Sequence, residues 1–197
     1  MRVHEALEQL DAIHDHLARA EVYRGFTVPG VALIGGVGLL AAVLQPPFEA
    51  ESFVAYWLAV AAIGLLLGFS ATAHAYFFRE DDIARRKTRR VLAQFLPSLA
   101  AGALITAALA RGGPDLVAYL PGLWAIAFGL GIISARPYLP RGIGYVGLAY
   151  LIAGGVLLTR RFAAPELAGW SVGGVFGAGH LLTAAVLHRD RPRDAHA

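Results

Sequence analysis

Two histidines, His74 and His180, lie inside long apolar stretches and are the residues of this sequence best placed to do chemistry. An ionisable group is costly to bury in lipid, so such a residue is by default a candidate functional residue. A neutral imidazole there can ligate haem iron, contact a quinone or relay a proton, or it can simply hydrogen-bond a neighbouring helix. His180 and His74 are therefore candidate cofactor-binding residues, and structural hydrogen bonding is the simpler interpretation of each.

The depths of the two histidines argue against a haem held by both. Counted at 1.5 Å per residue, His74 lies roughly 13 Å and His180 about 4 Å from the middle of its apolar stretch. Two axial ligands must lie at nearly one level, whereas these differ by roughly 10 Å. A haem with one histidine ligand or a quinone is compatible with the pattern. A proton relay would also need a membrane-embedded carboxylate, which the sequence lacks.

A second group of polar side chains lies near the N-terminus, where residues 3–23 are predicted to form an amphipathic cytoplasmic helix. His4, Glu8, Asp11 and Asp15 share one face of that helix. Imidazole and carboxylate groups in this arrangement could bind a divalent metal. The H-E-x-x-H fingerprint is missing, so we interpret the face as solvated and predict no metal site.

The apolar face of the same helix is a candidate interface. It carries Val3, Leu7, Leu10 and Leu17, at the spacing of three to four residues that marks an amphipathic helix. Such a face can pair with its own copy in a homodimer, bind a cytoplasmic protein through residues 3–23, or dock against the chain's own loops. The sequence leaves these alternatives open, and the early acidic residues disfavour an anionic lipid surface for this helix.

Known catalytic patterns are missing from the sequence. It contains no cysteine, which excludes disulfides, thiolate catalysis and iron–sulfur clusters. It has no G-x-S-x-G, no Walker phosphate loop and no D-x-D pair. We therefore predict neither an enzyme activity nor a resident cofactor, and haem at His180 is the alternative to that prediction.

The elements that position these residues are six predicted transmembrane helices. Hydrophobic residues make up 57% of the 197-residue chain and charged residues 16%, with a mean hydropathy of +0.57, well beyond the balance of soluble domains. Stretches long enough to cross a hydrocarbon core of about 30 Å lie near residues 26–45, 53–78, 91–110, 115–134, 143–159 and 167–188. Short connections between them predict an all-α, six-helix bundle in which consecutive helices are antiparallel and in contact.

The distribution of positive charge predicts the orientation of the chain. Fourteen of the 17 Lys and Arg residues fall on the side of the two termini, which predicts that both termini are cytoplasmic. The predicted organisation is a cytoplasmic helix (1–25), a transmembrane domain (26–188) and a cytoplasmic tail (189–197), with no cleavable signal peptide. Because the cations sit between apolar runs, the net charge of +3 does not indicate nucleic-acid binding, and the lipid bilayer is the predicted partner.

Small residues recur at regular spacing within the predicted spans. The helix-packing candidates are Gly64, Gly68, Gly169, Gly173 and Gly177, four residues apart within each helix, which allows close helix approach in lipid. They serve packing within one chain or, in the last helix, a homodimer. A Trp followed seven residues later by Gly in every second helix predicts three helical hairpins in series.

A run of six cations and three acids, residues 79–90, is predicted to be the longest internal loop. Juxtamembrane cations attract anionic lipid headgroups, at about 1 kcal/mol each. The simplest role of the run is to fix topology, and regulatory lipid binding is the alternative.

The N-terminal stretch EALEQLDAIHDHLARAEVYRGF (5–26), which leads directly into an apolar helix, resembles uncharacterised bacterial multi-pass inner-membrane proteins with the same layout. The resemblance implies a bacterial cytoplasmic (inner) membrane and carries no active-site residue over to this chain.

Together these patterns favour a non-enzymatic binding, regulatory or structural module. The alternatives are a haem- or quinone-binding redox protein centred on His180 and a small-solute transporter.

Overall fold

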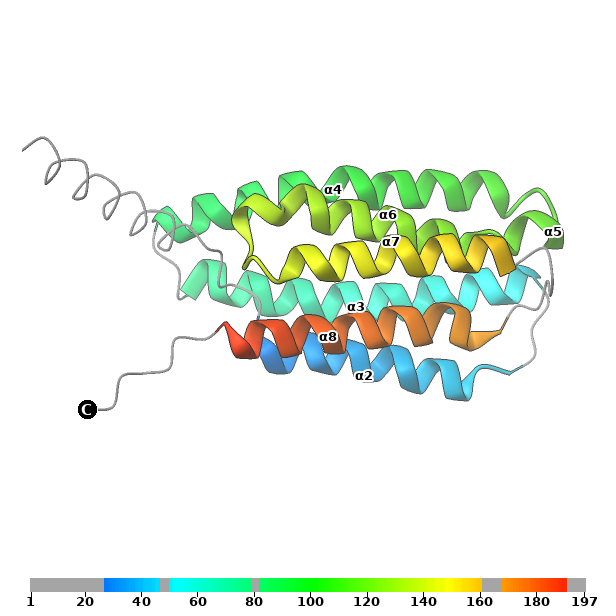
Figure 1. Ribbon diagram of the computed structural model, residues 1–197, viewed down its shortest axis with the longest axis horizontal. Coiled ribbons are helices and arrows are strands. Elements are labelled where there is room, and N and C mark those ends of the chain that lie inside the picture. Colours follow the sequence, from blue (N-terminus) through cyan, green and yellow to red (C-terminus); the bar gives the residue numbers. More distant parts are fainter. Residues whose placement is uncertain (1–26, 47–49, 79–81, 161–167, 191–197) are drawn as a thin grey trace, which may run out of the picture.

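The computed structural model describes residues 27–46, 50–78, 82–160 and 168–190. These residues are almost entirely helical, with six long helices that run up and down the molecule and no strand among them (Figure 1). The elements are α2 (Val28–Leu44), α3 (Ala50–Phe78), α4 (Asp82–Leu109), the short α5 (Pro114–Val117), α6 (Leu120–Ala135), the 3-10 turn η1 (Arg136–Tyr138), α7 (Ile143–Arg160), the π-helical turn η2 (Trp170–Gly174) and α8 (Val175–Arg189). The all-α prediction is confirmed, whereas the predicted N-terminal helix and tail lie outside the described residues.

Four of the described helical segments are long and apolar enough to cross a membrane. They are Glu51–Phe78, Ala84–Leu109, Pro114–Tyr138 and Trp170–Arg189. The other two, α2 and α7, are equally apolar in character but shorter, and a 17-residue helix spans only about 25 Å at 1.5 Å per residue. The length and composition of these helices therefore support a membrane protein. Each of the six predicted transmembrane helices is present as a helix, and four of the six are candidate spans.

The basic segment that was expected to be a loop is mostly helical. α4 begins at Asp82, so residues 82–90 form its first turns rather than a connection. Hydropathy marks only the part of a helix that lies in lipid, whereas Arg and Lys are good helix formers and extend the helix beyond its apolar stretch. The cations of residues 82–90 are consequently held in fixed positions on a helix.

The connection between α4 and α6 turns at Gly113. Its φ of 85° lies in the left-handed region, which a residue without a Cβ adopts at little cost. Pro114 follows at the first position of α5, where its missing N–H is not needed. These two residues reverse the chain within a few positions and return it along α4.

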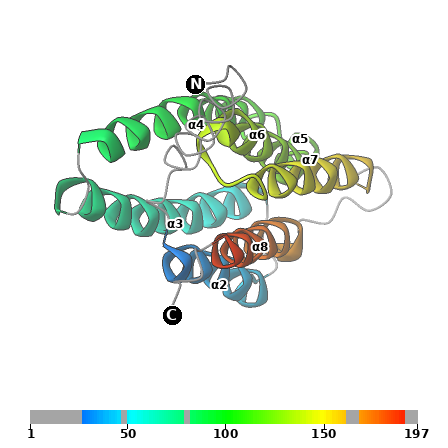
Figure 2. The ribbon, with the colours of Figure 1, turned by 60° about the vertical axis from the view of Figure 1, so that its left-hand side comes forward.

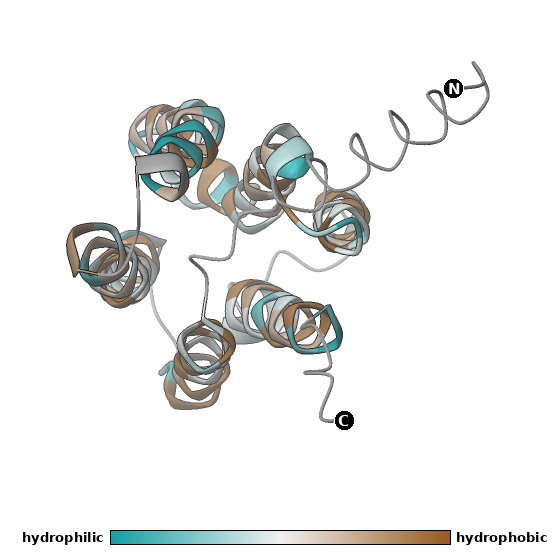
Figure 3. Cartoon of the chain, turned by 90° about the vertical axis from the view of Figure 1, so that its left-hand side faces the viewer, coloured by the Kyte–Doolittle hydropathy of each residue, from teal (hydrophilic) through white to brown (hydrophobic). Residues whose placement is uncertain are grey.

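The bundle closes between its first and last described helices. α2 packs along α8, α7 along α6, and α4 along α6. Figure 3 looks along the helices from the end that carries the connection between α3 and α4 (the α3–α4 end), and hydrophobic colours predominate along them. Consecutive helices are in contact as expected, but the contact between α3 and α4 is limited to few positions, and their joined ends lie next to each other (Figure 2).

Two buried clusters of side chains hold the helices together. One joins α4, α6 and α7 around Val91, Ile132 and Tyr150, and the other joins α2, α3, α5 and α6 around Phe53 and Trp57. Half of the most apolar window of the α5–α6 span is buried, against 17% for α3 and 11% for α4. α3 and α4 therefore turn most of their apolar surface outward, as helices in contact with lipid do.

The glycine stripe of the last helix faces α2 of the same chain. A Cβ on Gly177 would lie 2.9 Å from the backbone oxygen of Gly35, and a Cβ on Gly169 would lie 2.7 Å from that of Ala42. Gly173 likewise meets the backbone of α2. Only residues without a side chain allow two helices to approach this closely, so the stripe is used for packing within the chain.

The other glycine pair also faces α2, at a looser contact. Positions for a Cβ on Gly64 and Gly68 of α3 lie 3.5 and 3.6 Å from methyl groups of Ile34. These are ordinary van der Waals distances. The two glycine-bearing helices thus lie on either side of α2, and α8 is the one that needs glycine for its approach.

The tryptophans of the predicted hairpin repeat lie in three different environments. Trp57 is buried and its Nε1 donates a hydrogen bond of 2.7 Å to the side chain of Gln45. Trp124 is half-buried and donates to the hydroxyl of Thr106 at 2.8 Å. Trp170 is 58% exposed. The three tryptophans are therefore regularly spaced in the sequence, but their side chains are not packed in equivalent ways.

Candidate functional site

His180 lies in an aromatic cluster built from three helices. The centroid of its ring is 5.5 Å from that of Phe128 in α6. Tyr150 of α7 and Phe176 of α8 lie 5.0 and 5.3 Å from the same Phe128 ring, measured between centroids. The span of α8 places the imidazole one turn beyond Gly177, so the histidine that the sequence singles out sits where α6, α7 and α8 meet.

Hydrogen bonds in this cluster fix the tautomer of His180. Its Nδ1 lies 2.7 Å from the backbone oxygen of Phe176. Because a carbonyl oxygen can only accept, Nδ1 must carry the proton, which leaves Nε2 with a free lone pair. The Tyr150 hydroxyl lies 3.2 Å from the same oxygen, to which it donates, and 3.3 Å from Nδ1. No hydrogen bond from the described part of the chain reaches Nε2.

The surroundings of His180 are closely packed. A Cβ on the neighbouring Gly179 would fall on the ring and hydroxyl of Tyr150, and a Cβ on Gly35 of α2 would lie 3.2 Å from the His180 Cβ. The imidazole and phenol groups therefore connect α7 to α8 at a point where the two helices touch. This arrangement fits the structural interpretation of His180, in which a membrane imidazole hydrogen-bonds its neighbours.

His74 lies in a different part of the molecule. It is on the outward face of α3, is exposed, and its ring stacks on Phe78 one turn along the same helix, with 5.2 Å between centroids. The ring contacts of His180 come from α6, whereas that of His74 stays within α3. The structure therefore does not bring the two candidate histidines together. This agrees with the sequence argument against a haem held by both.

Other polar side chains inside the bundle are used in packing. The Thr106 hydroxyl, buried in α4, accepts from Trp124 and donates to the backbone oxygen of Gly102 at 2.7 Å. The Tyr56 hydroxyl donates to the backbone oxygen of Ala41 at 2.7 Å. Such pairing is what lipid demands of buried polar groups, and it leaves these residues without a free group for a ligand.

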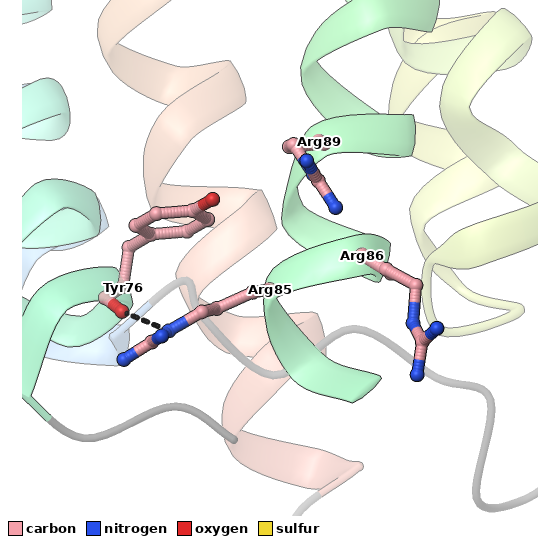
Figure 4. A pocket seen from close by; sticks show the side chains of 4 residues that line it. All are labelled: Tyr76, Arg85, Arg86 and Arg89. Carbon is pink, nitrogen blue, oxygen red and sulfur yellow. Dashed lines mark hydrogen bonds between the residues drawn. The ribbon is translucent and has the colours of Figure 1, made fainter. Parts of the chain in front are cut away.

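A polar cleft opens at the α3–α4 end, between the last turn of α3 and the first turns of α4. It has a volume of about 330 Å³ and is lined by Tyr76, Arg85, Arg86 and Arg89 (Figure 4). These four residues are called the arginine cleft below. Tyr76 comes from α3 and the three arginines from α4. The cleft therefore lies between the two helix ends, and the helical start of α4 fixes the arginines around it.

One arginine of the cleft is already engaged and two are not. Arg85 donates from Nε to the backbone oxygen of Tyr76 at 2.9 Å, and its guanidinium lies 5.6 Å from the centroid of the Tyr76 ring. The bond caps a carbonyl near the end of α3, where helices leave such groups unpaired. Arg86 and Arg89 are exposed, and within the described ranges neither makes an ion pair or hydrogen bond. The cleft therefore presents two guanidinium groups that have no partner among the described residues.

Sequence reasoning identified the cations of this cleft but not its aromatic member. Tyr76 was not singled out, although an aromatic residue just inside a basic segment is typical of a membrane interface. The arginines were expected in a loop, where their directions would be undefined. What the sequence could not give is the separation of α3 from α4, which places Tyr76 opposite the arginines.

The described residues contain no group of three or more His, Asp or Glu side chains that could hold a metal ion. The N-terminal candidates lie outside the described ranges. They are Val3, Leu7, Leu10 and Leu17 on one face of the predicted helix and the acidic and histidine residues on the other.

Comparisons with protein-family models, with curated proteins and with solved structures found no match. The fold and the cleft alone therefore define the class, which is an all-helical membrane protein with a polar cleft at one end of its bundle.

Proposed function

We propose that this chain is a non-enzymatic, membrane-embedded binding module whose ligand carries an anionic group that binds in the arginine cleft. The observation that carries the proposal is the pair of guanidinium groups of Arg86 and Arg89, which are free of partners in the described chain and face a cleft. Guanidinium groups bind phosphate and carboxylate through paired, charge-assisted hydrogen bonds. Binding here would leave the polar pairs inside the bundle undisturbed.

The electrostatics of the cleft support an anion. The described side chains that line it with Tyr76 are three arginines. Two of them lie within the first turn and a half of α4, where the helix dipole adds positive potential. Lys87 and Arg90 follow on the same helix. An anion placed between Arg86 and Arg89 would relieve the mutual repulsion of this charge.

The proposal extends to the membrane topology. We propose that all six long helices cross the bilayer, since 17 residues is at the lower end of the range for a transmembrane helix and α2 and α7 run alongside the longer four. The α3–α4 end would face the cytoplasm, because most of the Lys and Arg residues fall on that side. The layout of residues 5–26 supports a bacterial inner membrane.

Thermal unfolding of the detergent-solubilised protein tests the binding function. Inorganic pyrophosphate at ten times its dissociation constant stabilises a protein that binds it only when folded by about 1.4 kcal/mol, or roughly 3–5 °C for a chain of this size. We expect this increase in Tm for the wild type, relative to sodium chloride at the same ionic strength. The double variant Arg86→Ala/Arg89→Ala should lose it.

A charge-matched control separates the cleft from the general charge of this end. Arg90 and Arg189 are exposed and lie outside the cleft lining, so Arg90→Ala/Arg189→Ala removes the same charge without changing the cleft. This control should respond to pyrophosphate as the wild type does. Equal responses of all three proteins would refute an anion site in the cleft.

A second candidate function, a redox protein with haem or quinone at His180, is favoured by one observation. A histidine whose Nδ1 donates to a backbone carbonyl presents Nε2 as a ligand, the usual arrangement at metal and haem centres. The close packing around His180 weighs against it. An absorption spectrum of the purified protein before and after dithionite decides the matter, because a Soret band that shifts on reduction and is lost in His180→Ala would replace the binding-module proposal.

A further inference from the structure

The arginine cleft lies at the level of the chain where lipid headgroups meet hydrocarbon. The candidate span of α3 ends at Phe78, two residues beyond Tyr76, and the cations of α4 end at Arg90, after which its apolar stretch begins. Tyrosine and arginine are both enriched at this depth of a bilayer. A ligand in the cleft is therefore at the membrane surface and next to lipid.

Apolar surface continues from the cleft into the membrane. On α3, Phe69 lies two turns before Tyr76, toward the middle of the span, and is 67% exposed. On α4, Leu92 and Leu96 follow the cleft arginines and are 44% and 63% exposed. Their exposure and the sparse contact between α3 and α4 mean that the other helix of the pair does not cover these side chains. A ligand with a charged head and an apolar tail meets matching surfaces on both helices.

We infer that the ligand of the cleft is an anionic phospholipid, whose headgroup phosphate is held by Arg86 and Arg89 and whose acyl chains lie along α3 and α4. This inference rests on the proposed function and names its ligand class. Arginine matches the geometry of phosphate with two parallel hydrogen bonds, and the hydroxyl of Tyr76 is a further possible donor. Among the described residues, the lining carries no acidic side chain that would repel the phosphate.

Bound lipid would join two helices that otherwise scarcely touch. Arg85 already crosses from α4 to the backbone of α3. A phosphate between the α4 arginines and the α3 tyrosine adds a second connection at the same level, while the exposed apolar surfaces of both helices contact the tail. The lipid thus acts as a structural ligand of the α3–α4 hairpin, and its presence stabilises the separation that forms the cleft.

Lipid binding by the delipidated protein in a non-ionic detergent tests the inference. Native mass spectrometry would compare short-chain phosphatidylglycerol with phosphatidylcholine of the same chain length, and with glycerol phosphate as a soluble headgroup. We expect phosphatidylglycerol to bind more tightly than either. Removing two cations worth about 1 kcal/mol each should weaken that binding roughly 30-fold in Arg86→Ala/Arg89→Ala, and the control Arg90→Ala/Arg189→Ala should change it less than about 3-fold at 0.15 M salt.

A charge-preserving variant controls for the case in which Arg86→Ala/Arg89→Ala misfolds. Arg86→Lys/Arg89→Lys keeps the net charge but loses the planar fork, so we expect it to fold as the wild type does and to bind phosphatidylglycerol with intermediate affinity. Equal weakening in the cleft variant and the charge-matched control would overturn the inference, because general surface charge would then explain the binding.

The remaining outcomes separate this inference from the function on which it rests. If glycerol phosphate binds as tightly as phosphatidylglycerol and depends on Arg86 and Arg89, the cleft is an anion site but its ligand is water-soluble, and only the lipid inference fails. If neither phosphate compound distinguishes the cleft variant from the control, both the inference and the proposed function fail.

Discussion

Gly177→Ala tests whether the contact between α8 and α2 holds the bundle closed. The added Cβ would lie 2.9 Å from the Gly35 backbone oxygen and 2.6 Å from the Leu39 side chain, so a helix must shift. Overpacking of this kind costs about 1–3 kcal/mol, whereas the change from Gly to Ala gains about 1 kcal/mol in helix propensity. Gly36→Ala on α2 is the matched control, because its Cβ meets nothing within 4 Å and only the propensity gain remains.

The difference between the two variants isolates the steric cost. We expect Gly177→Ala to have a free energy of unfolding about 1–3 kcal/mol below that of Gly36→Ala, measured by reversible unfolding in mixed micelles of increasing SDS content. Gly35→Ala approaches the same contact from the other helix, with its Cβ 3.0 Å from the Gly177 oxygen, and should be destabilising in the same sense. Equal stability of Gly177→Ala and Gly36→Ala, within about 0.5 kcal/mol, would refute the reasoning.

Three further predictions concern the remaining polar contacts and the topology. The hydrogen bond between Trp124 and Thr106 should give a coupling energy of about 0.6–1.7 kcal/mol in a double-mutant cycle of Trp124→Phe and Thr106→Val, and a coupling near zero would show that the contact contributes nothing. Tyr150→Phe should cost less than about 1 kcal/mol in the same unfolding assay, because His180 still satisfies the Phe176 carbonyl. Since the chain has no cysteine, Arg141→Cys and Arg111→Cys give single labelling sites at opposite ends of the bundle. We expect a membrane-impermeant thiol reagent outside the cell to label only Arg111→Cys, and labelling of Arg141→Cys would reverse the proposed orientation.

The helices could be predicted from the sequence because lipid imposes a simple rule on them. A span must be apolar and must satisfy its own backbone, so the predicted stretches match the observed helices within a few residues over most of the chain. The exception is the start of α4, where charged residues continue the helix outside the apolar stretch. Hydropathy carries no information on which helices touch. The pairing of α2 with α8 and the sparse contact between α3 and α4 could therefore not be predicted from it.

The candidate site was predictable only where a residue contrasts with its surroundings. His180 stands out in an apolar stretch, but its neighbours Phe128 and Tyr150 do not, because aromatic residues are common in such helices. The glycine stripe indicated a close approach without indicating the helix that makes it. Tyr76 and the arginines come from two different helices, and only the three-dimensional arrangement shows that they line one cleft.

The pairing of α2 with α8 has a consequence for the order in which the protein is made. α2 is the first of the described helices to leave the ribosome and α8 is the last, so Gly35 and its neighbours have no partner while the intervening helices enter the membrane. A chain that stops after α7 would insert most of its helices yet leave the backbone-exposing face of α2 open to lipid or to other proteins. Such an unfinished bundle is the kind of intermediate that cellular quality control recognises, and α8 is thus the element whose arrival completes the molecule.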